Sequence, residues 1–119
     1  MNLKKLGQNY INFLTDFGLN DHMELDSFKN IFSESCRKII NGNIACNNIH
    51  ELKTQLEQVK SATEDWNIKP NNIIQSDNAE ICVVQYELHS ANLGNFITIA
   101  ILGYNNGLIE EINEVYNQK

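Results

Sequence analysis

The side chain best suited to acid–base chemistry in this sequence is Glu110, in an apolar segment near the C-terminus. Among isoleucine and tyrosine side chains a carboxylate loses hydration, which favours its neutral, proton-holding form. The hydroxyls of Tyr10 and Tyr86 could share this chemistry, because a buried tyrosine hydroxyl usually finds a hydrogen-bonding partner. These three groups are therefore the candidates for proton transfer or hydrolysis. The alternative is that Glu110 is a hydrated rim carboxylate and that the tyrosine hydroxyls are structural.

Aromatic side chains offer a second kind of site, an apolar pocket. Phe13 and Phe17 share a stripe with Tyr10, and these rings either fill the core or form a pocket wall. Trp66 either begins a strand near a pocket mouth or simply packs there. The acidic residues just before it, Glu64 and Asp65, are interpreted as loop charges.

Cysteine and histidine give no sign of a metal centre or of a disulfide framework. The three cysteines are odd in number and form no C-x-x-C pair, so buried reduced thiols are expected. The three histidines form no H-x-x-x-H or H-E-x-x-H pattern. No metal and no cofactor is therefore predicted. The cysteines and histidines are Cys36, Cys46, Cys82, His22, His50 and His89.

Composition limits the classes of partner. The chain has 119 residues, 42% of them hydrophobic and 20% charged, which is typical of one globular domain spanning residues 1–119. Its net charge of −6 argues against nucleic acid and against an anionic membrane surface. No segment has the run of roughly 18 apolar residues that a membrane span needs, and the start lacks the apolar core of a secretory signal. A cytoplasmic protein is expected.

The first part of the chain is predicted to be helical. Apolar residues recur at three- and four-residue steps over residues 3–17, and Gly18 suits a C-terminal cap. Asn20 or Asp21 can cap a shorter second helix carrying the apolar residues of 25–32.

A hairpin, a third helix and a meander are predicted next. Asn41-Gly42 suits a two-residue turn between short strands, pairing Ile39 with Ile44 and Arg37 with Cys46. This register places Cys36 and Cys46 on opposite faces, against a disulfide. A third helix with Asn48 as its N-cap follows. The remaining strands are predicted at residues 66–76, 79–90, 95–104 and 108–116, with a second turn at Asn106-Gly107.

The predicted order of helices and strands indicates an α+β fold, with helices packed on one side of a curved, mostly antiparallel sheet. The assumed loop lengths pair Ile101 with Ile112 and Ile97 with Tyr116. The opposite sheet face is mixed and too apolar for plain solvated surface, so a second subunit is expected to cover it. The face predicted to lie under the helices collects Cys82, Val84, Tyr86, Leu88, Ile97, Ile99, Ile101, Ile112 and Tyr116, with Glu110 and Glu114 near its rim.

At this point the chain resembles the nuclear transport factor 2-like superfamily, especially its SnoaL-like and ketosteroid-isomerase-like branch. Residues 8–16 with Asn20-Asp21 are similar to its opening helix, residues 48–56 to its third helix, and residues 106–116 to its closing strand. The resemblance implies a cone fold, with three helices over a curved sheet, and usually a dimer. It also implies a deep, mostly apolar pocket lined from the closing strand by Glu110, Ile112, Glu114 and Tyr116.

The departures from that branch concern its catalytic groups. Its first-strand carboxylate base falls here among Lys38, Ile39 and Ile40, and its second acid falls at about Ile99. An isoleucine cannot move a proton. Only the first-helix tyrosine has a counterpart, Tyr10, so the isomerase machinery is predicted to be absent.

Three functions remain open from the sequence. The first is a protein that binds a small apolar molecule. The second is a SnoaL-like or isomerase-like enzyme of proton-transfer or hydrolytic chemistry on a small hydrophobic substrate. The third is an interaction module that forms a homodimer through its outer sheet face. The candidate pocket residues are Tyr10, Phe13, Phe17, Trp66, Tyr86, Ile99, Glu110, Ile112 and Tyr116.

Overall fold

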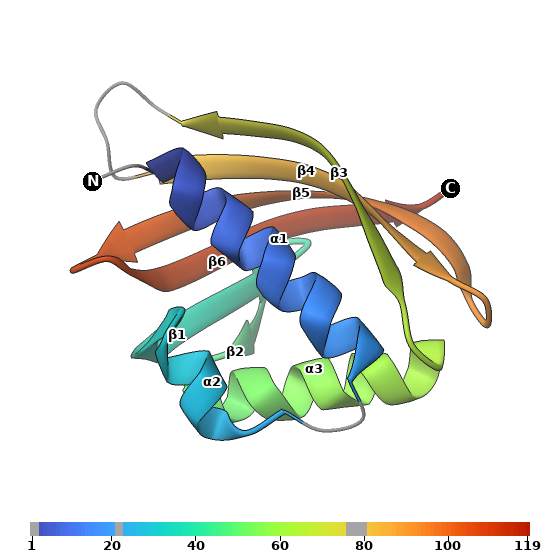
Figure 1. Cartoon of the computed structure of the whole chain (residues 1–119), viewed down its shortest axis with the longest axis horizontal. Helices are drawn as coiled ribbons and strands as arrows, with labels where there is room; N and C mark the ends of the chain where they lie inside the picture. The colour runs from blue at the N-terminus through green and yellow to red at the C-terminus, as the bar shows by residue number, and fades with distance from the viewer. Residues whose placement is uncertain (1–2, 21–22, 76–80) are drawn as a thin grey trace.

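The computed structural model describes residues 3–20, 23–75 and 81–119 (Figure 1). Helices and strands follow one another in nearly the predicted order. The main difference is that the second helix is short and that the strand after it begins at Phe32. The elements are α1 (Leu3–Leu19), α2 (Leu25–Lys29), β1 (Phe32–Ile40), β2 (Asn43–Cys46), α3 (Ile49–Thr63), β3 (Asn67–Gln75), β4 (Ile81–Ser90), β5 (Gly94–Asn105) and β6 (Leu108–Gln118).

The strands form one curved sheet in the order β2-β1-β6-β5-β4-β3. Only the pair β1 and β6 is parallel among the described strands; every other neighbouring pair is antiparallel. Helix α1 packs on the β3 and β4 end of the sheet, and α3 on the β1 and β2 end (Figure 1). The predicted α+β architecture, with three helices on a curved and mostly antiparallel sheet, is confirmed.

The helix boundaries confirm the predicted cap at Asn48 but not those at Gly18 and Asn20. The Asn48 side chain accepts a hydrogen bond from the Glu51 backbone N–H at 2.9 Å, as predicted for an N-cap. The predicted cap at Gly18 was wrong, because α1 continues to Leu19. Asn20 does not cap α2, because the N-cap of that helix is Glu24. The Asn20 side chain instead donates to the Asp16 carbonyl. Asp21 and His22 lie outside the described residues.

Both Asn-Gly turns form with positive φ at each residue, as predicted. The β4–β5 connection is one residue shorter than assumed, and a bulge at Gly103/Tyr104 shifts β6 against β5. Leu102, rather than Ile101, therefore pairs with Ile112. Because one residue of slip exchanges the two faces, Ile99 and Ile101 lie on the outer face, 47% and 43% exposed.

A second bulge changes the first hairpin. Ile39 pairs with Ile44 as predicted, but the bulge at Lys38/Ile39 pairs Cys46 with Lys38 rather than with Arg37. Cys36, Lys38 and Cys46 are consequently all buried on the inner side. The prediction that Cys36 and Cys46 face opposite ways was wrong, although both thiols are free. Burial raises the pKa of Cys36 to about 12, so this thiol is held protonated.

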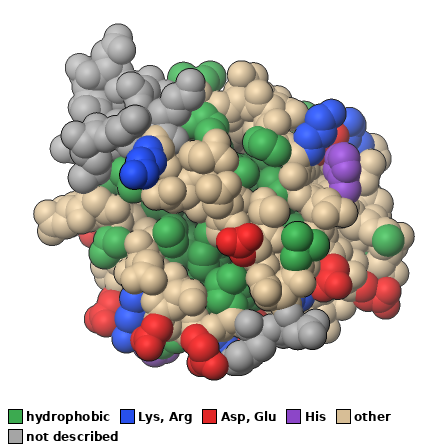
Figure 2. Space-filling model, viewed as in Figure 1, with side chains coloured by type: hydrophobic (Ala, Val, Ile, Leu, Met, Phe, Trp, Pro, Cys, Tyr) green, Lys and Arg blue, Asp and Glu red, His purple; other side chains and the backbone are tan. Residues whose placement is uncertain are grey.

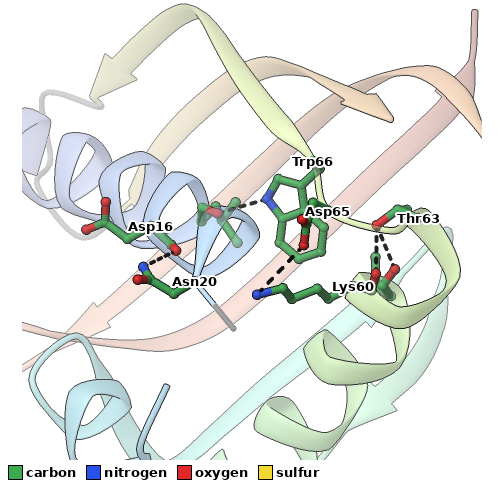
Figure 3. Close-up of polar contacts among 8 residues, drawn as sticks. Asp16, Asn20, Lys60, Thr63, Asp65 and Trp66 are labelled. Carbon is green, nitrogen blue, oxygen red and sulfur yellow. Dashed lines mark hydrogen bonds and ion pairs between the residues drawn. The ribbon is translucent and has the colours of Figure 1, made fainter. Parts of the chain in front are cut away.

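An aromatic cluster fixes the helices on the sheet. Phe13 contacts Phe28 and Phe32 edge to face, at ring-centroid distances of 4.8 and 5.1 Å. Trp66 stacks on Phe17 at 5.9 Å and donates its indole N–H to the Leu14 carbonyl at 2.8 Å. Figure 3 shows this indole directed at the backbone of α1. The cluster therefore joins α1, α2, β1 and the start of β3.

The helix-covered side of the molecule is chemically mixed. Figure 2 shows hydrophobic side chains there in separate groups among polar ones, with acidic side chains along the lower edge of the view. No helix in the described ranges is long and apolar enough to cross a bilayer. No group of three or more His, Cys, Asp or Glu side chains within those ranges is placed to hold a metal ion.

Candidate functional site

A cavity of about 220 Å³ lies between α3 and the inner face of the sheet. Most of its wall is apolar, and its polar side chains come from β1, α3, β4, β5 and β6. This combination of an apolar wall and a few polar groups is typical of small-molecule sites. The lining residues are Leu14, Lys38, Ile40, Gln55, Leu56, Val59, Ala62, Thr63, Trp66, Tyr86, Leu88, Leu93, Phe96, Thr98, Glu114 and Tyr116.

The inner wall of the cavity carries a buried ion pair. The Lys38 Nζ lies 3.6 Å from the Glu114 Oε1, and the two side chains are 4% and 8% exposed. Lys38 also donates to the Gln55 Oε1 at 3.0 Å. Since a single charge buried without a partner is costly, each of these groups is needed to keep the other in place.

Strand geometry explains why both charged side chains point inward. In β1, Cys36 and Lys38 are buried on alternate positions, and in β6 Ile112 and Glu114 are buried in the same way. The parallel pairing of these strands places Lys38 opposite Ile112 and Ile40 opposite Glu114. The charged residues are thus one inward position apart on neighbouring strands.

Two tyrosines extend this polar group toward α1. The Tyr86 hydroxyl donates to the Glu114 Oε2 at 3.5 Å and accepts a hydrogen bond from Tyr10. Burial, and after it the charge of Glu114, raises the pKa of Tyr86 well above its ordinary value. Burial and the neighbouring Tyr86 raise the pKa of Tyr10 in the same direction. Both hydroxyls therefore stay protonated at neutral pH and act as hydrogen-bond donors.

The outer end of the cavity is apolar and more exposed. Phe96 and Tyr116 meet edge to face at 5.8 Å, and Tyr116 is 38% exposed. Leu93, in the β4–β5 turn, is 41% exposed and also lines the cavity. A molecule entering here would pass apolar side chains before it reached Lys38 and Glu114.

This arrangement of helices and sheet is shared with solved structures. A protein from Jannaschia sp. CCS1 that carries the name of a SnoaL-like polyketide cyclase superposes with a TM-score of 0.78, over 95% of this chain and 86% of that one, at 14% identity. The fold is nuclear transport factor 2-like.

Two further solved structures are named nuclear transport factor 2-like proteins of unknown function. The protein from Exiguobacterium sp. 255-15 gives a TM-score of 0.74 at 16% identity, covering 96% of this chain and 99% of that one. The protein from Cytophaga hutchinsonii ATCC 33406 gives 0.74 at 8% identity, covering 98% and 91%. No protein-family model and no curated protein matches the sequence. At these identities the nuclear transport factor 2-like likeness concerns the fold.

Within the nuclear transport factor 2-like fold, several predicted pocket residues come together. Trp66, Tyr86 and Tyr116 line the cavity, and Tyr10 reaches it through Tyr86. Three others are buried without lining it: Phe13 and Phe17 belong to the aromatic cluster, and Ile112 is fully buried in β6.

Two predicted pocket residues lie elsewhere. Ile99 was placed on the wrong face, because the β4–β5 turn is one residue shorter than assumed. Glu110 is exposed, because the Gly103/Tyr104 bulge breaks the alternation at the start of β6. The buried carboxylate is instead Glu114, which the family resemblance had implied as a pocket residue.

Lys38, Gln55 and Thr98 were not predicted as site residues. Gln55 stands on the inner side of α3, where a polar residue interrupts an apolar helix face. Lys38 follows Cys36 at the two-residue step of a strand, and this alternation was the one available signal. The predicted pairing of Arg37 with Cys46 assumed a hairpin without a bulge, and it placed Lys38 on the face opposite Cys46.

Proposed function

We propose that this nuclear transport factor 2-like protein binds a small, largely apolar molecule in the cavity between α3 and the sheet. The observation that carries the proposal is the cavity itself, whose apolar wall ends at the buried pair of Lys38 and Glu114. Side chains of the core do not fill this space, and its wall combines apolar surface with a few directional polar groups.

The cavity volume limits the size of the ligand. Pockets for drug-sized molecules measure about 300–1,000 Å³, whereas an apolar cavity of about 150 Å³ can hold benzene. A volume of about 220 Å³ therefore suits one ring with a short substituent, or an aliphatic molecule of similar size. Larger ligands would have to extend past Leu93 and Tyr116 into solvent.

Binding agrees with the site better than proton transfer does. A general base must be free to accept a proton from the bound molecule. Glu114 is already engaged by Lys38 and by Tyr86, and the two tyrosines are held protonated. The arrangement therefore favours holding a ligand in one orientation.

Plugging the cavity tests the proposal. Ala62 lines the cavity but is exposed, so Ala62→Trp places an indole at its edge without enlarging the core. We expect this variant to weaken the binding of toluene at least about tenfold, as measured by calorimetric titration. The indole would take the place of part of the ligand's apolar contact with the cavity, and losing such a contact lowers the binding free energy by about 1–3 kcal/mol.

The matched control is Ser61→Trp, at the neighbouring exposed position of α3, which does not line the cavity. This variant should bind toluene like the unmodified protein. Equal affinity in all three proteins would show that binding occurs elsewhere. Absence of toluene binding in the unmodified protein would count against an apolar site.

We also propose that two copies associate through the outer sheet face. Apolar side chains on β3, β4, β5 and β6 lie next to one another there, and several are 43–60% exposed. Contiguous apolar surface of this kind marks interaction sites, and symmetric pairing of like faces is the commonest solution. The patch consists of Ile74, Ile81, Ile99, Ile101 and Val115.

A charge in the centre of this patch is expected to separate the copies. Ile101→Asp should convert a species of about twice 13.6 kDa into one of that mass in sedimentation at high micromolar concentration, because it buries an unpaired carboxylate in the contact. Ile44→Asp is the control, since Ile44 is 58% exposed on β2, away from the patch. An unmodified protein that sediments as a monomer would contradict the association.

A further inference from the structure

We propose that the molecule bound in the cavity carries a neutral head group that both donates and accepts hydrogen bonds, a primary carboxamide being the simplest, and that Lys38 and Glu114 recognise it. This inference rests on the proposed function, because it names the ligand class of the same cavity. It is carried by the geometry of the ion pair.

The pair is open rather than closed. The 3.6 Å between the Lys38 Nζ and the Glu114 Oε1 exceeds the usual 2.7–3.2 Å of a hydrogen bond. The other carboxylate oxygen receives the Tyr86 hydroxyl at 3.5 Å, which is also long. A carboxylate has about four acceptor positions and an ammonium has three donors. Beyond the contacts they already make, both groups therefore keep hydrogen-bonding positions for a ligand that bridges them from the cavity.

Charge balance selects a neutral head group. Lys38 and Glu114 neutralise each other in a buried setting, with side chains 4% and 8% exposed. An anionic head group would face the Glu114 carboxylate, and a cationic one would face the Lys38 ammonium. Either would leave an extra buried charge without a partner, which is strongly unfavourable. A neutral group avoids this cost.

The spacing of the pair suits an amide. From standard bond lengths, the oxygen and nitrogen of an amide lie about 2.2–2.3 Å apart. Its carbonyl oxygen can accept from Lys38 while its N–H donates to Glu114, since the two protein atoms are separated by 3.6 Å. Hydrogen bonds to charged groups are stronger than neutral ones, so this contact would also orient the ligand. The apolar part would then extend toward Phe96 and Tyr116.

Four probes of one ring size separate the possibilities: toluene, benzamide, benzoate and benzylammonium. Their affinities for the full chain are measured by calorimetric titration at neutral pH. We expect benzamide to bind at least about tenfold more tightly than each of the other three, because only it satisfies both charged groups.

A variant that removes the pair tests which residues cause the preference. In Lys38→Met with Glu114→Met, benzamide should bind no more tightly than toluene. The matched control is Arg37→Met with Glu111→Met, an exposed pair on the same two strands whose charged atoms are 3.5 Å apart. In this control benzamide should keep its advantage.

The outcomes distinguish this inference from the proposed function. Toluene binding together with benzoate or benzylammonium affinity equal to that of benzamide would overturn the head-group assignment and leave an apolar binding site standing. A benzamide preference that survives in the Lys38 and Glu114 double variant would also overturn it. If none of the four probes binds, the assignment and the proposed function both fail.

Discussion

Replacing Lys38 alone with methionine is expected to lower the free energy of unfolding by about 3–5 kcal/mol. The substitution keeps the approximate volume of the side chain but leaves the Glu114 carboxylate buried, with only Tyr86 and no countercharge nearby. A small domain has a total stability of about 5–15 kcal/mol, so the loss is a large part of it. Urea unfolding at neutral pH, followed by tryptophan fluorescence of Trp66, measures the change.

The double replacement of Lys38 and Glu114 by methionine is the informative partner of this variant. Removing both charges also removes their desolvation cost, so the double variant should be close to the unmodified protein or more stable. The difference between the single and the double variant is then the coupling between the two sites. A double variant as unstable as the single one would mean that Lys38 stabilises the fold through Gln55, its other partner, rather than through Glu114.

The elements of this fold are local in origin, and for that reason much of the architecture was predictable. Asn48 with Glu51, and the two Asn-Gly turns, act over a few residues, and the structure has them where the sequence indicated. The curved sheet under three helices follows from the order of such elements.

Which side chains face the cavity was less predictable, because a bulge or a one-residue change in a loop exchanges the faces of a strand. The three-residue turn before β5 moved Ile99 outward and brought Thr98 inward. The Lys38/Ile39 bulge is equally invisible in the sequence, and the regular hairpin expected in its place hid the alternation of Lys38 with Cys36. Glu114 was predicted near the rim of the helix-covered face from the strand register, and as a pocket residue only through the family resemblance.

Replacing Trp66 with alanine is expected to lower the free energy of unfolding by about 3–5 kcal/mol, the range for large aromatic side chains in a core. Trp66 is 2% exposed and stacks on Phe17. Its indole N–H donates to the Leu14 carbonyl, a hydrogen bond drawn in Figure 3. Its loss opens a void between α1, β3 and the cavity. Circular dichroism in a urea titration measures the effect without relying on the indole. Trp66→Phe, which keeps a ring but loses the hydrogen bond, should cost less.

Gly18 shows how specific this contact is. A Cβ built on Gly18 would overlap two atoms of the Trp66 ring, so Gly18→Ala should cost about 1–3 kcal/mol through overpacking. In the Trp66→Ala background this penalty should fall, because the ring is gone, although the Trp66 carbonyl oxygen at 2.7 Å remains. Gly7 offers the comparison, since its Cβ would meet Cys82 and Ile73 at the other end of α1. The costs of Gly7→Ala and Trp66→Ala should simply add, because distant sites act independently. If the cost of Gly18→Ala simply adds to that of Trp66→Ala, as expected for Gly7→Ala, the close packing of α1 at Gly18 does not depend on the indole of Trp66.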